Sequence, residues 1–151
     1  MKFNNKKLIL SDICSRCVYC VMVQILYHDE DDYGKPLKEI KEINRKLTSA
    51  DIVNFAINID KTIESIKPYL RPMSSMTTEE ICAITNIIGE GFTYNDDILS
   101  ICTEDIVKIP FQKINELINF LYARHLDFNH LIEKGLALEA PAGMYNKEDK
   151  Q

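Results

Sequence analysis

The sequence predicts a single α+β domain in which a β-rich N-terminal half, a meander or partly open barrel, precedes a mostly helical C-terminal half. Three observations indicate this order. Residues 17–27, CVYCVMVQILY, are dominated by β-branched and aromatic residues, which are typical of a buried strand. Residues 111–121 carry apolar side chains at helical spacing. Between them, residues 67–80, KPYLRPMSSMTTEE, combine two prolines with a helix-start signal and mark the junction of the halves.

Length and composition are those of a soluble globular protein. A chain of 151 residues can bury a core as one domain, which we assign to residues 1–145, with residues 146–151 as a polar tail. No apolar run approaches the roughly 20 residues of a membrane helix, and the apolar stretch near the N-terminus is too short for a secretory signal. We therefore expect a cytoplasmic protein with no membrane partner.

The first half is expected to contain short strands joined by turns. An apolar segment that includes Leu8 and Ile13 could be a strand or a single helical turn. The strand at residues 17–27 should be buried on both faces. Residues 28–36, HDEDDYGKP, are typical of an exposed turn, because acidic residues, glycine and proline favour turns.

Two further segments precede the junction. Apolar residues of the first recur at helical spacing: Leu37, Ile40, Ile43 and Leu47. This spacing favours a helix over a strand on pattern alone. Residues 52–59, IVNFAINI, alternate in a way that predicts a strand. A short turn is then expected to lead through Ile63 and Ile66.

The junction itself is predicted in more detail. Pro68 and Pro72 fix their own backbone and disfavour the helical region for the residues before them, so residues 67–72 should be extended. Thr77 and Glu80 have the spacing of a capping box, in which each side chain accepts a hydrogen bond from the backbone N–H of the other residue. A helix should therefore start directly after Thr77.

The helix after the junction should span residues 78–88 and end at Gly89 or Gly91. Residues 92–97, FTYNDD, are expected to form a loop. Residues 98–109 could be short strands or a short helix, and their β-branched content favours strand.

The clearest helix is predicted to begin after Pro110 and to reach roughly Arg124. Its apolar stripe consists of Phe111, Ile114, Leu117, Ile118 and Leu121. A further short helix over residues 128–134 should be capped by Asp127 and ended by Gly135. The residues after it are expected to be extended along the domain.

Lys67, Tyr69 and Arg71 are the candidate binding residues, because they could present a recognition edge on the extended junction. The alternative is a rigid connector whose Tyr69, Leu70 and Met73 pack between the halves. The connector is favoured, because prolines in connecting segments usually serve backbone geometry.

Charge is unevenly distributed along the chain. Residues 1–75 carry 12 Lys and Arg against 10 Asp and Glu, whereas residues 76–151 carry 6 against 13. A nucleic-acid-binding face would therefore have to lie in the first half. The basic series there consists of Lys38, Lys41, Arg45 and Lys46. Glu39 and Glu42 interrupt it, which favours a solvated face over a phosphate track.

Cys14, Cys17 and Cys20 are weak candidates for metal ligands. Their spacing resembles an iron–sulfur run, but that run continues with a cysteine and a proline where this chain has Gln24 and Ile25. Two residues three apart in a strand also point to opposite faces. Buried core thiols are the favoured interpretation, so no metal or other cofactor is predicted.

His125, Asp127 and His130 could in principle support base catalysis. No serine or cysteine nucleophile is placed beside them by sequence, and no HExxH, P-loop, GxSxG or GxGxxG motif is present. The favoured interpretation is structural: His125 ends a helix and Asp127 caps the next one.

Two stretches carry a resemblance to known sequences. Residues 67–80 and residues 126–145, LDFNHLIEKGLALEAPAGMY, resemble motifs in small uncharacterised proteins of Bacteroides-type gut bacteria and their phages and mobile elements. Asp12, Ile13 and Cys14, followed by the apolar residues 18–23, resemble the start of that group. The resemblance covers about a third of the chain.

The resemblance implies a shared fold and an origin in a mobile element, but no activity. It implies short strands before the proline segment, which favours β structure for residues 35–47. Similar proteins have apolar residues or glycine at the positions of Cys17 and Cys20, which further weakens the metal interpretation.

Taken together, these features favour a non-enzymatic interaction or regulatory protein with a protein partner. The alternatives are a nucleic-acid-binding protein that uses the β-rich half, with Tyr69 as a stacking aromatic, and a metal- or thiol-dependent enzyme at the three cysteines. Nucleic acid is the less favoured partner because the chain is acidic overall.

Overall fold

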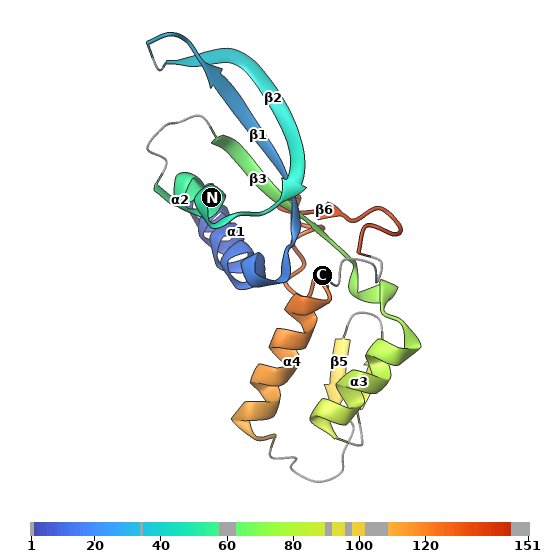
Figure 1. Ribbon diagram of the computed structural model, residues 1–151. Helices are drawn as coiled ribbons and strands as arrows, with labels where there is room; N and C mark the ends of the chain where they lie inside the picture. Colours follow the sequence, from blue (N-terminus) through green and yellow to red (C-terminus); the bar gives the residue numbers. More distant parts are fainter. Residues whose placement is uncertain are drawn as a thin grey trace. The chain divides into compact units, whose positions relative to one another are not determined.

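The computed structural model describes residues 2–33, 35–57, 63–89, 92–95, 98–101 and 109–145. The fold is α+β, as predicted, with a curled, half-barrel sheet built mainly from the first half of the chain (Figure 1). Two compact units are present: the sheet unit, Met1–Leu70 with His130–Gln151, and the helical unit, Arg71–Asn129. Their boundary at Leu70 and Arg71 lies inside the predicted junction. Each unit has its own hydrophobic core.

Four strands form the sheet of the sheet unit. They are β1 (Met22–Glu30), β2 (Pro36–Lys46), β3 (Ile63–Leu70) and β6 (Leu138–Glu139), arranged in the order β2-β1-β3-β6. β1 pairs antiparallel with both β2 and β3, and β6 pairs parallel with β3. Of the two predicted forms, a meander or a partly open barrel, the curled sheet fits the partly open barrel. In a simple meander β2 would lie between β1 and β3, whereas here β1 lies between β2 and β3.

Alternate residues of β1 and β3 face the core of the sheet unit. Val23 and Ile25 of β1 lie opposite Pro68 and Ile66 of β3, and all four side chains are buried. The residues between them face the other side of the sheet and are half-buried. One face of the sheet is therefore apolar and the other is polar.

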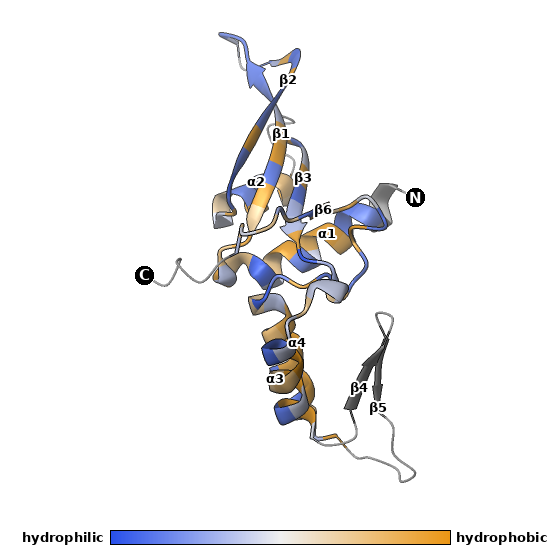
Figure 2. Cartoon of the chain, turned by 90° about the vertical axis from the view of Figure 1, so that its right-hand side faces the viewer, coloured by the Kyte–Doolittle hydropathy of each residue, from blue (hydrophilic) through white to orange (hydrophobic). Residues whose placement is uncertain are grey.

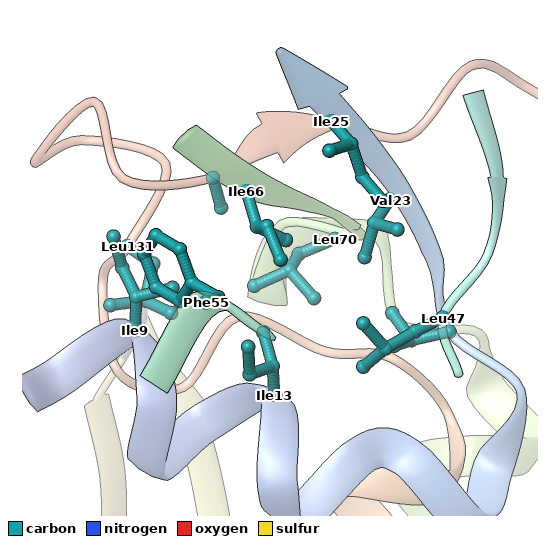
Figure 3. Close-up of a cluster of buried hydrophobic side chains, with 11 residues drawn as sticks. Ile9, Ile13, Val23, Ile25, Leu47, Phe55, Ile66, Leu70 and Leu131 are labelled. Atoms are coloured by element: carbon teal, nitrogen blue, oxygen red, sulfur yellow. The ribbon is translucent and has the colours of Figure 1, made fainter. Parts of the chain in front are cut away.

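Two helices cover the apolar face, α1 (Lys2–Arg16) and α2 (Ser49–Ile57). The close-up in Figure 3 shows Ile9 and Ile13 of α1 and Phe55 of α2 directed toward Ile66 and Leu70 of β3. Ile13, Ile66 and Leu70 are fully buried. Burial of such side chains contributes about 1.5–3 kcal/mol each, so this layer holds the unit together.

A fully buried ion pair lies on α1. Arg16 Nε donates to Asp12 Oδ2 at 2.7 Å and Arg16 Nη2 donates to Asp12 Oδ1 at 3.1 Å, with both side chains inaccessible to solvent. The i,i+4 spacing places both groups on one face of the helix. Removing either partner would leave a buried charge, which costs about 3–5 kcal/mol.

The helical unit contains α3 (Thr78–Ile88), α4 (Phe111–Ala123), the short 3-10 helix η2 (Met73–Ser75) and the hairpin of β4 (Phe92–Asn95) and β5 (Ile98–Ile101). Its core cluster consists of Met73, Ile84, Leu121 and Leu126. The predicted capping box is present, since Glu80 N–H donates to Thr77 Oγ1 at 3.2 Å and Thr77 N–H donates to Glu80 Oε2 at 3.0 Å. Gly89 ends α3 at a φ of 113°.

The predicted helix after Pro110 is confirmed, and its apolar stripe is only partly covered. Leu121 is buried and Leu117 packs against the core, whereas Phe111 is 76% exposed. Ile114 and Ile118 are also exposed. The sequence pattern therefore identified the helix correctly, and part of its apolar stripe is exposed in the structure.

Several predictions for the sheet unit were wrong. The apolar segment with Leu8 and Ile13 belongs to the 15-residue helix α1. Residues 17–20 form the 3-10 helix η1 (Cys17–Tyr19) and a left-handed turn at Cys20, so the strand begins only at Met22 and continues into the predicted turn. A residue at φ 55° cannot continue a strand, which explains the late start.

Residues 52–57 are not a strand, because Ser49–Ile57 form α2; residues 58 and 59 of the predicted strand lie outside the described residues. The Thr48 and Asp51 side chains cap this helix: Thr48 N–H donates to Asp51 Oδ2 at 2.9 Å and Asp51 N–H donates to Thr48 Oγ1 at 3.3 Å. Asp51 and Phe55 lie on the buried side of α2 at i,i+4. A local capping signal thus outweighs the alternation.

Residues 37–46 lie in β2, as the resemblance implied and against their helical spacing, and Leu47 follows the strand. The predicted turn over Ile63 and Ile66 is instead part of β3, which extends into the proline segment as predicted. These strands form because β1 supplies backbone partners on both of its sides.

Two predictions for the second half were also wrong. Residues 92–95 are strand β4 rather than a loop, and residues 98–101 are strand as favoured. Residues 128–134 form turns rather than a helix, because His130 has a φ of 55°, although Gly135 ends the segment as predicted, with a φ of 67°. Residues 102–108 of the predicted 98–109 segment lie outside the described residues, and so does the tail, residues 146–151.

Candidate interaction surface

β2 is the most exposed strand of the sheet unit. All of its 11 residues are exposed except Arg45, which is half-buried. β1 occupies one edge of β2, and no described strand occupies the other edge. Every second residue of β2 therefore directs its backbone N–H and C=O groups away from the sheet. We call this the free edge of β2.

Apolar side chains accompany the free edge. Leu37 is 44% exposed, Ile40 is 52% exposed and Ile43 is 39% exposed. Ile40 and Ile43 are three residues apart in the regularly paired part of the strand, so their side chains lie on opposite faces. Figure 2 shows hydrophobic and hydrophilic stretches along the same strand. A partner strand could cover apolar groups on both faces.

The hairpin of β1 and β2 is fastened by ion pairs. Lys41 Nζ donates to a carboxylate oxygen of Asp29 across the two strands. This hydrogen bond and the attraction of the Asp29 charge raise the pKa of Lys41. At the other end of β2, Arg45 holds Asp51 with two hydrogen bonds of 2.9 and 2.5 Å. Asp51 is buried, so this pair fixes β2 to the start of α2.

Lys67 and Tyr69 lie on the polar face of the sheet. They alternate along β3 with Ile66, Pro68 and Leu70, whose side chains are buried. Tyr69 Oη donates to Asn44 Oδ1 of β2 at 3.0 Å. This hydrogen bond joins β3 to β2 across β1, which lies between them. The structure thus brings two of the three predicted binding residues onto one face.

Arg71, the third predicted residue, belongs to the helical unit and binds Glu80. Its Nη1 donates to Glu80 Oε1 at 2.8 Å and its Nη2 donates to Glu80 Oε2 at 3.0 Å. Nη2 also donates to the Ser75 carbonyl at 2.9 Å. The backbone of Arg71 bonds on both sides, to the His125 carbonyl and the Asp127 N–H, each at 2.8 Å. The guanidinium is therefore engaged inside its own unit.

Glu80 is buried at 7% side-chain exposure and also lies 3.9 Å from Arg124 Nε. Burial alone would raise the pKa of its carboxyl. Hydrogen bonds from Arg71 and from the Thr77 N–H outweigh burial, so the pKa of Glu80 lies below its ordinary value. The ionised Glu80 carboxylate therefore has a structural role, because it accepts the Thr77 N–H of the capping box at the start of α3.

The three candidate cysteines do not form a metal site. Cys14 and Cys20 are exposed, and Cys17 is half-buried against the core of the sheet unit. Cys82 on α3 is exposed too, so the interpretation as buried core thiols was wrong for most of the described cysteines; Cys102 lies outside them. Within the described ranges, no cluster of three His, Cys, Asp or Glu side chains could hold a metal ion.

His125 and His130 fall in different units. His125 is buried and ends α4 with a φ of 55°, which agrees with its structural interpretation. His130 Nδ1 lies 3.7 Å from Glu133 Oε2 on the surface of the sheet unit. Asp127 was predicted to cap a helix, but the residues after it form turns; its backbone N–H donates to the Arg71 carbonyl. The buried position of His125 and the backbone contact of Asp127 therefore fit the structural interpretation.

Tyr145 is a structural residue that sequence reasoning missed. Its Oη accepts from the Met22 N–H at 3.1 Å and donates to the Tyr69 carbonyl at 2.7 Å, so it bridges β1 and β3. Burial raises the pKa of Tyr145 to about 12. No local sequence signal marks this contact, because its partners lie 123 and 76 residues away.

The free edge of β2 was missed as well. Its signal is present in the sequence as the segment LKEIKEI, residues 37–43. The three-residue apolar spacing favours a helix on pattern alone, and the resemblance, which favours a strand, does not indicate an edge. The segment can be recognised as an edge only after its pairing with β1 is known.

None of the described helices has the length and apolar character that crossing a membrane requires. No protein-family model, curated protein or solved structure matches this chain.

Proposed function

We propose that the protein is a non-enzymatic interaction protein that binds a protein partner by strand addition at the free edge of β2. The observation that carries this proposal is an 11-residue edge strand with an exposed backbone edge and exposed Leu37, Ile40 and Ile43. In strand addition, main-chain hydrogen bonds supply affinity and alternate side chains supply specificity. β2 offers both.

The stiffness of the hairpin supports the proposal. The Lys41–Asp29 pair joins the two strands, and the Arg45–Asp51 pair fixes β2 to α2. A strand that is already extended and anchored loses little conformational freedom when a partner pairs with it. Binding at this edge therefore needs no refolding of the sheet unit.

The regulatory role and the mobile-element origin are part of the same proposal and rest on the resemblance of residues 67–80 and 126–145. A gene neighbourhood of phage or defence genes would support that origin. A neighbourhood of housekeeping genes alone would contradict it.

The proposal can be tested by photo-crosslinking. A photoreactive phenylalanine analogue at Ile40, which is 52% exposed on β2, is compared with one at Val53, which is 50% exposed on α2. We expect protein adducts from position 40 and not from position 53, in the purified protein or in a host extract. Equal yields at the two positions, or no adduct at position 40, would overturn the proposal.

A second candidate function is nucleic-acid binding, and one observation favours it: Lys67 and Tyr69 share the polar face of the sheet. A lysine beside an aromatic ring suits a single strand, with phosphate contact and base stacking. Fewer basic side chains are available for phosphate contact, however, because Lys41 and Arg45 of the basic series and also Arg71 are bound to carboxylates. Titration with a fluorescent oligonucleotide tests this; affinity that does not fall with rising salt would exclude it.

A further inference from the structure

We propose that the partner strand at the free edge is β2 of a second copy of this chain, paired antiparallel about a two-fold axis at Ile40. This inference rests on the proposed function and specifies its partner. It is drawn from the order of side chains along residues 37–43, Leu-Lys-Glu-Ile-Lys-Glu-Ile, which is complementary to itself when reversed.

With Ile40 opposite Ile40 of the second copy, every neighbouring position is matched. Leu37 faces Ile43, so an apolar side chain meets an apolar one. Lys38 faces Glu42, and Glu39 faces Lys41, so each charge meets its opposite. Because the axis repeats each pair, all seven positions from Leu37 to Ile43 have a suitable partner.

The backbone allows this register. Residues directly opposite each other in an antiparallel pair must both direct their N–H and C=O groups toward the shared edge, or both away from it. These groups alternate along β2 from Ile40 to Lys46, where its pairing with β1 is regular, and that pairing shifts between Ile40 and Pro36. Along a regular strand a residue can face only residues an even number of positions away. Leu37 and Ile43, Lys38 and Glu42, and Ile40 with itself all satisfy this condition.

The next permitted registers are unfavourable. A shift in one direction puts Lys41 opposite Lys41 and Ile40 opposite Glu42. A shift in the other direction puts Glu39 opposite Glu39 and Leu37 opposite Lys41. Like charges directly opposite each other destabilise a strand pair, so the side chains select the register centred on Ile40.

Charges on an edge strand also protect proteins from unwanted pairing. That role needs no particular order of signs, and lysines alone would serve it. In β2 the signs are ordered so that a second copy is attracted and a shifted copy is repelled. The exposed Ile40 at the centre would be covered by its own counterpart, since it is 52% exposed in the single chain.

Exchange of single charges tests the register. In Lys38→Glu, the introduced glutamate faces the native Glu42 twice across the axis; in Glu42→Lys, the introduced lysine faces the native Lys38 twice. We expect each variant to dissociate with a Kd raised about tenfold or more, because two attractive contacts become repulsive. Sedimentation equilibrium measures the dimer, and circular dichroism confirms that each variant is folded.

Two combinations should restore the dimer. In an equimolar mixture of Lys38→Glu and Glu42→Lys, the introduced glutamate of one chain faces the introduced lysine of the other. The native Glu42 of the first chain then faces the native Lys38 of the second, so a mixed dimer should form. The double variant Lys38→Glu, Glu42→Lys should again form a dimer with itself. If both single variants remain dimeric, or if neither combination restores association, the proposed register is overturned.

A disulfide provides an independent measurement. In a chain with its five native cysteines replaced by serine, Ile40→Cys lies directly opposite itself and should crosslink on mild oxidation. Ile43→Cys is the matched control, because its counterpart lies six residues away along the strand, or about 20 Å. Equal crosslinking of both variants would contradict the register.

The two proposals fail differently. A wild-type chain that is monomeric up to high concentration overturns the dimer. If position 40 then crosslinks to a different protein, the edge is still an interaction surface and only the identity of the partner is wrong. If position 40 crosslinks to nothing, both proposals fail.

Discussion

Arg71 clamps Glu80 with both arms of its guanidinium, at 2.8 and 3.0 Å from the two carboxylate oxygens. The same carboxylate closes the capping box with Thr77. One buried anion therefore joins the first residue of the helical unit to the start of α3.

Replacing Arg71 with alanine should destabilise the helical unit by about 2 kcal/mol, because the buried Glu80 carboxylate loses two charge-assisted hydrogen bonds. Urea unfolding followed by circular dichroism measures the change. Lys67→Ala is the matched control, since removing this half-exposed lysine of β3 should cost less than about 0.5 kcal/mol. Equal losses in the two variants would contradict the structural role of Arg71.

The stability of the helical unit should depend on pH through Glu80. Its pKa in the folded chain lies below the ordinary value of 4.5, so folding favours the ionised carboxylate. The stabilisation is present above pH 4.5 and is lost as the pH falls through the folded-state pKa. Wild type should therefore lose stability on acidification relative to Glu80→Gln. If wild type and Glu80→Gln lose the same free energy of unfolding on acidification, the lowered pKa of Glu80 is contradicted.

The pKa of Tyr145 predicts that stability falls as the pH rises at the alkaline end, whereas Glu80 lowers stability on acidification. Its folded-state pKa of about 12 exceeds the ordinary value of 10.0. Below pH 10 both states carry the proton, and between pH 10 and 12 only the folded state retains it. Stability should therefore fall over that range by up to about 2 kcal/mol relative to Tyr145→Phe.

Thermal unfolding of wild type and Tyr145→Phe at several pH values measures this difference. At neutral pH the variant should itself be less stable by about 1–3 kcal/mol, because the Met22 N–H and the Tyr69 carbonyl lose their shared partner. A constant difference from about pH 8 to about pH 12 would show that the Tyr145 hydroxyl is not held as described.

The described cysteines should differ in reactivity according to exposure. Cys14, Cys20 and Cys82 are exposed, and Cys17 is half-buried. Brief alkylation of the native protein, followed by peptide mapping, should label the three exposed thiols before Cys17. Unfolding in urea provides the control, in which all four should react alike. Faster labelling of Cys17 in the native state would contradict its packing against the core.

Local signals predicted local structure well. The Thr77–Glu80 box and Gly89 located α3 because capping depends on residues within a few positions of one another. Pro68 and Pro72 indicated extended backbone for the same reason, since each acts on its own φ and on the residue before it. The boundary between the two units falls in this segment.

Non-local pairing explains most of the failures. The segment LKEIKEI has the spacing of a helix and is a strand only because β1 lies beside it. Cys17 and Val18 have strand propensity, but α1 and the left-handed Cys20 precede the sheet. Of the predicted binding residues, Lys67 and Tyr69 share a face because they are alternate residues of β3. Arg71 is instead hydrogen-bonded to Glu80, nine residues later.

The contact of Tyr145 with β1 and β3 sets an order for folding during synthesis. The helical unit is continuous in sequence and is complete once residue 129 has emerged from the ribosome. The sheet unit must wait for Leu131, β6 and Tyr145, although its first strand starts at Met22. A nascent chain should therefore carry a complete helical unit while its sheet is still open, and Tyr145 joins β1 to β3 only after it has been synthesised.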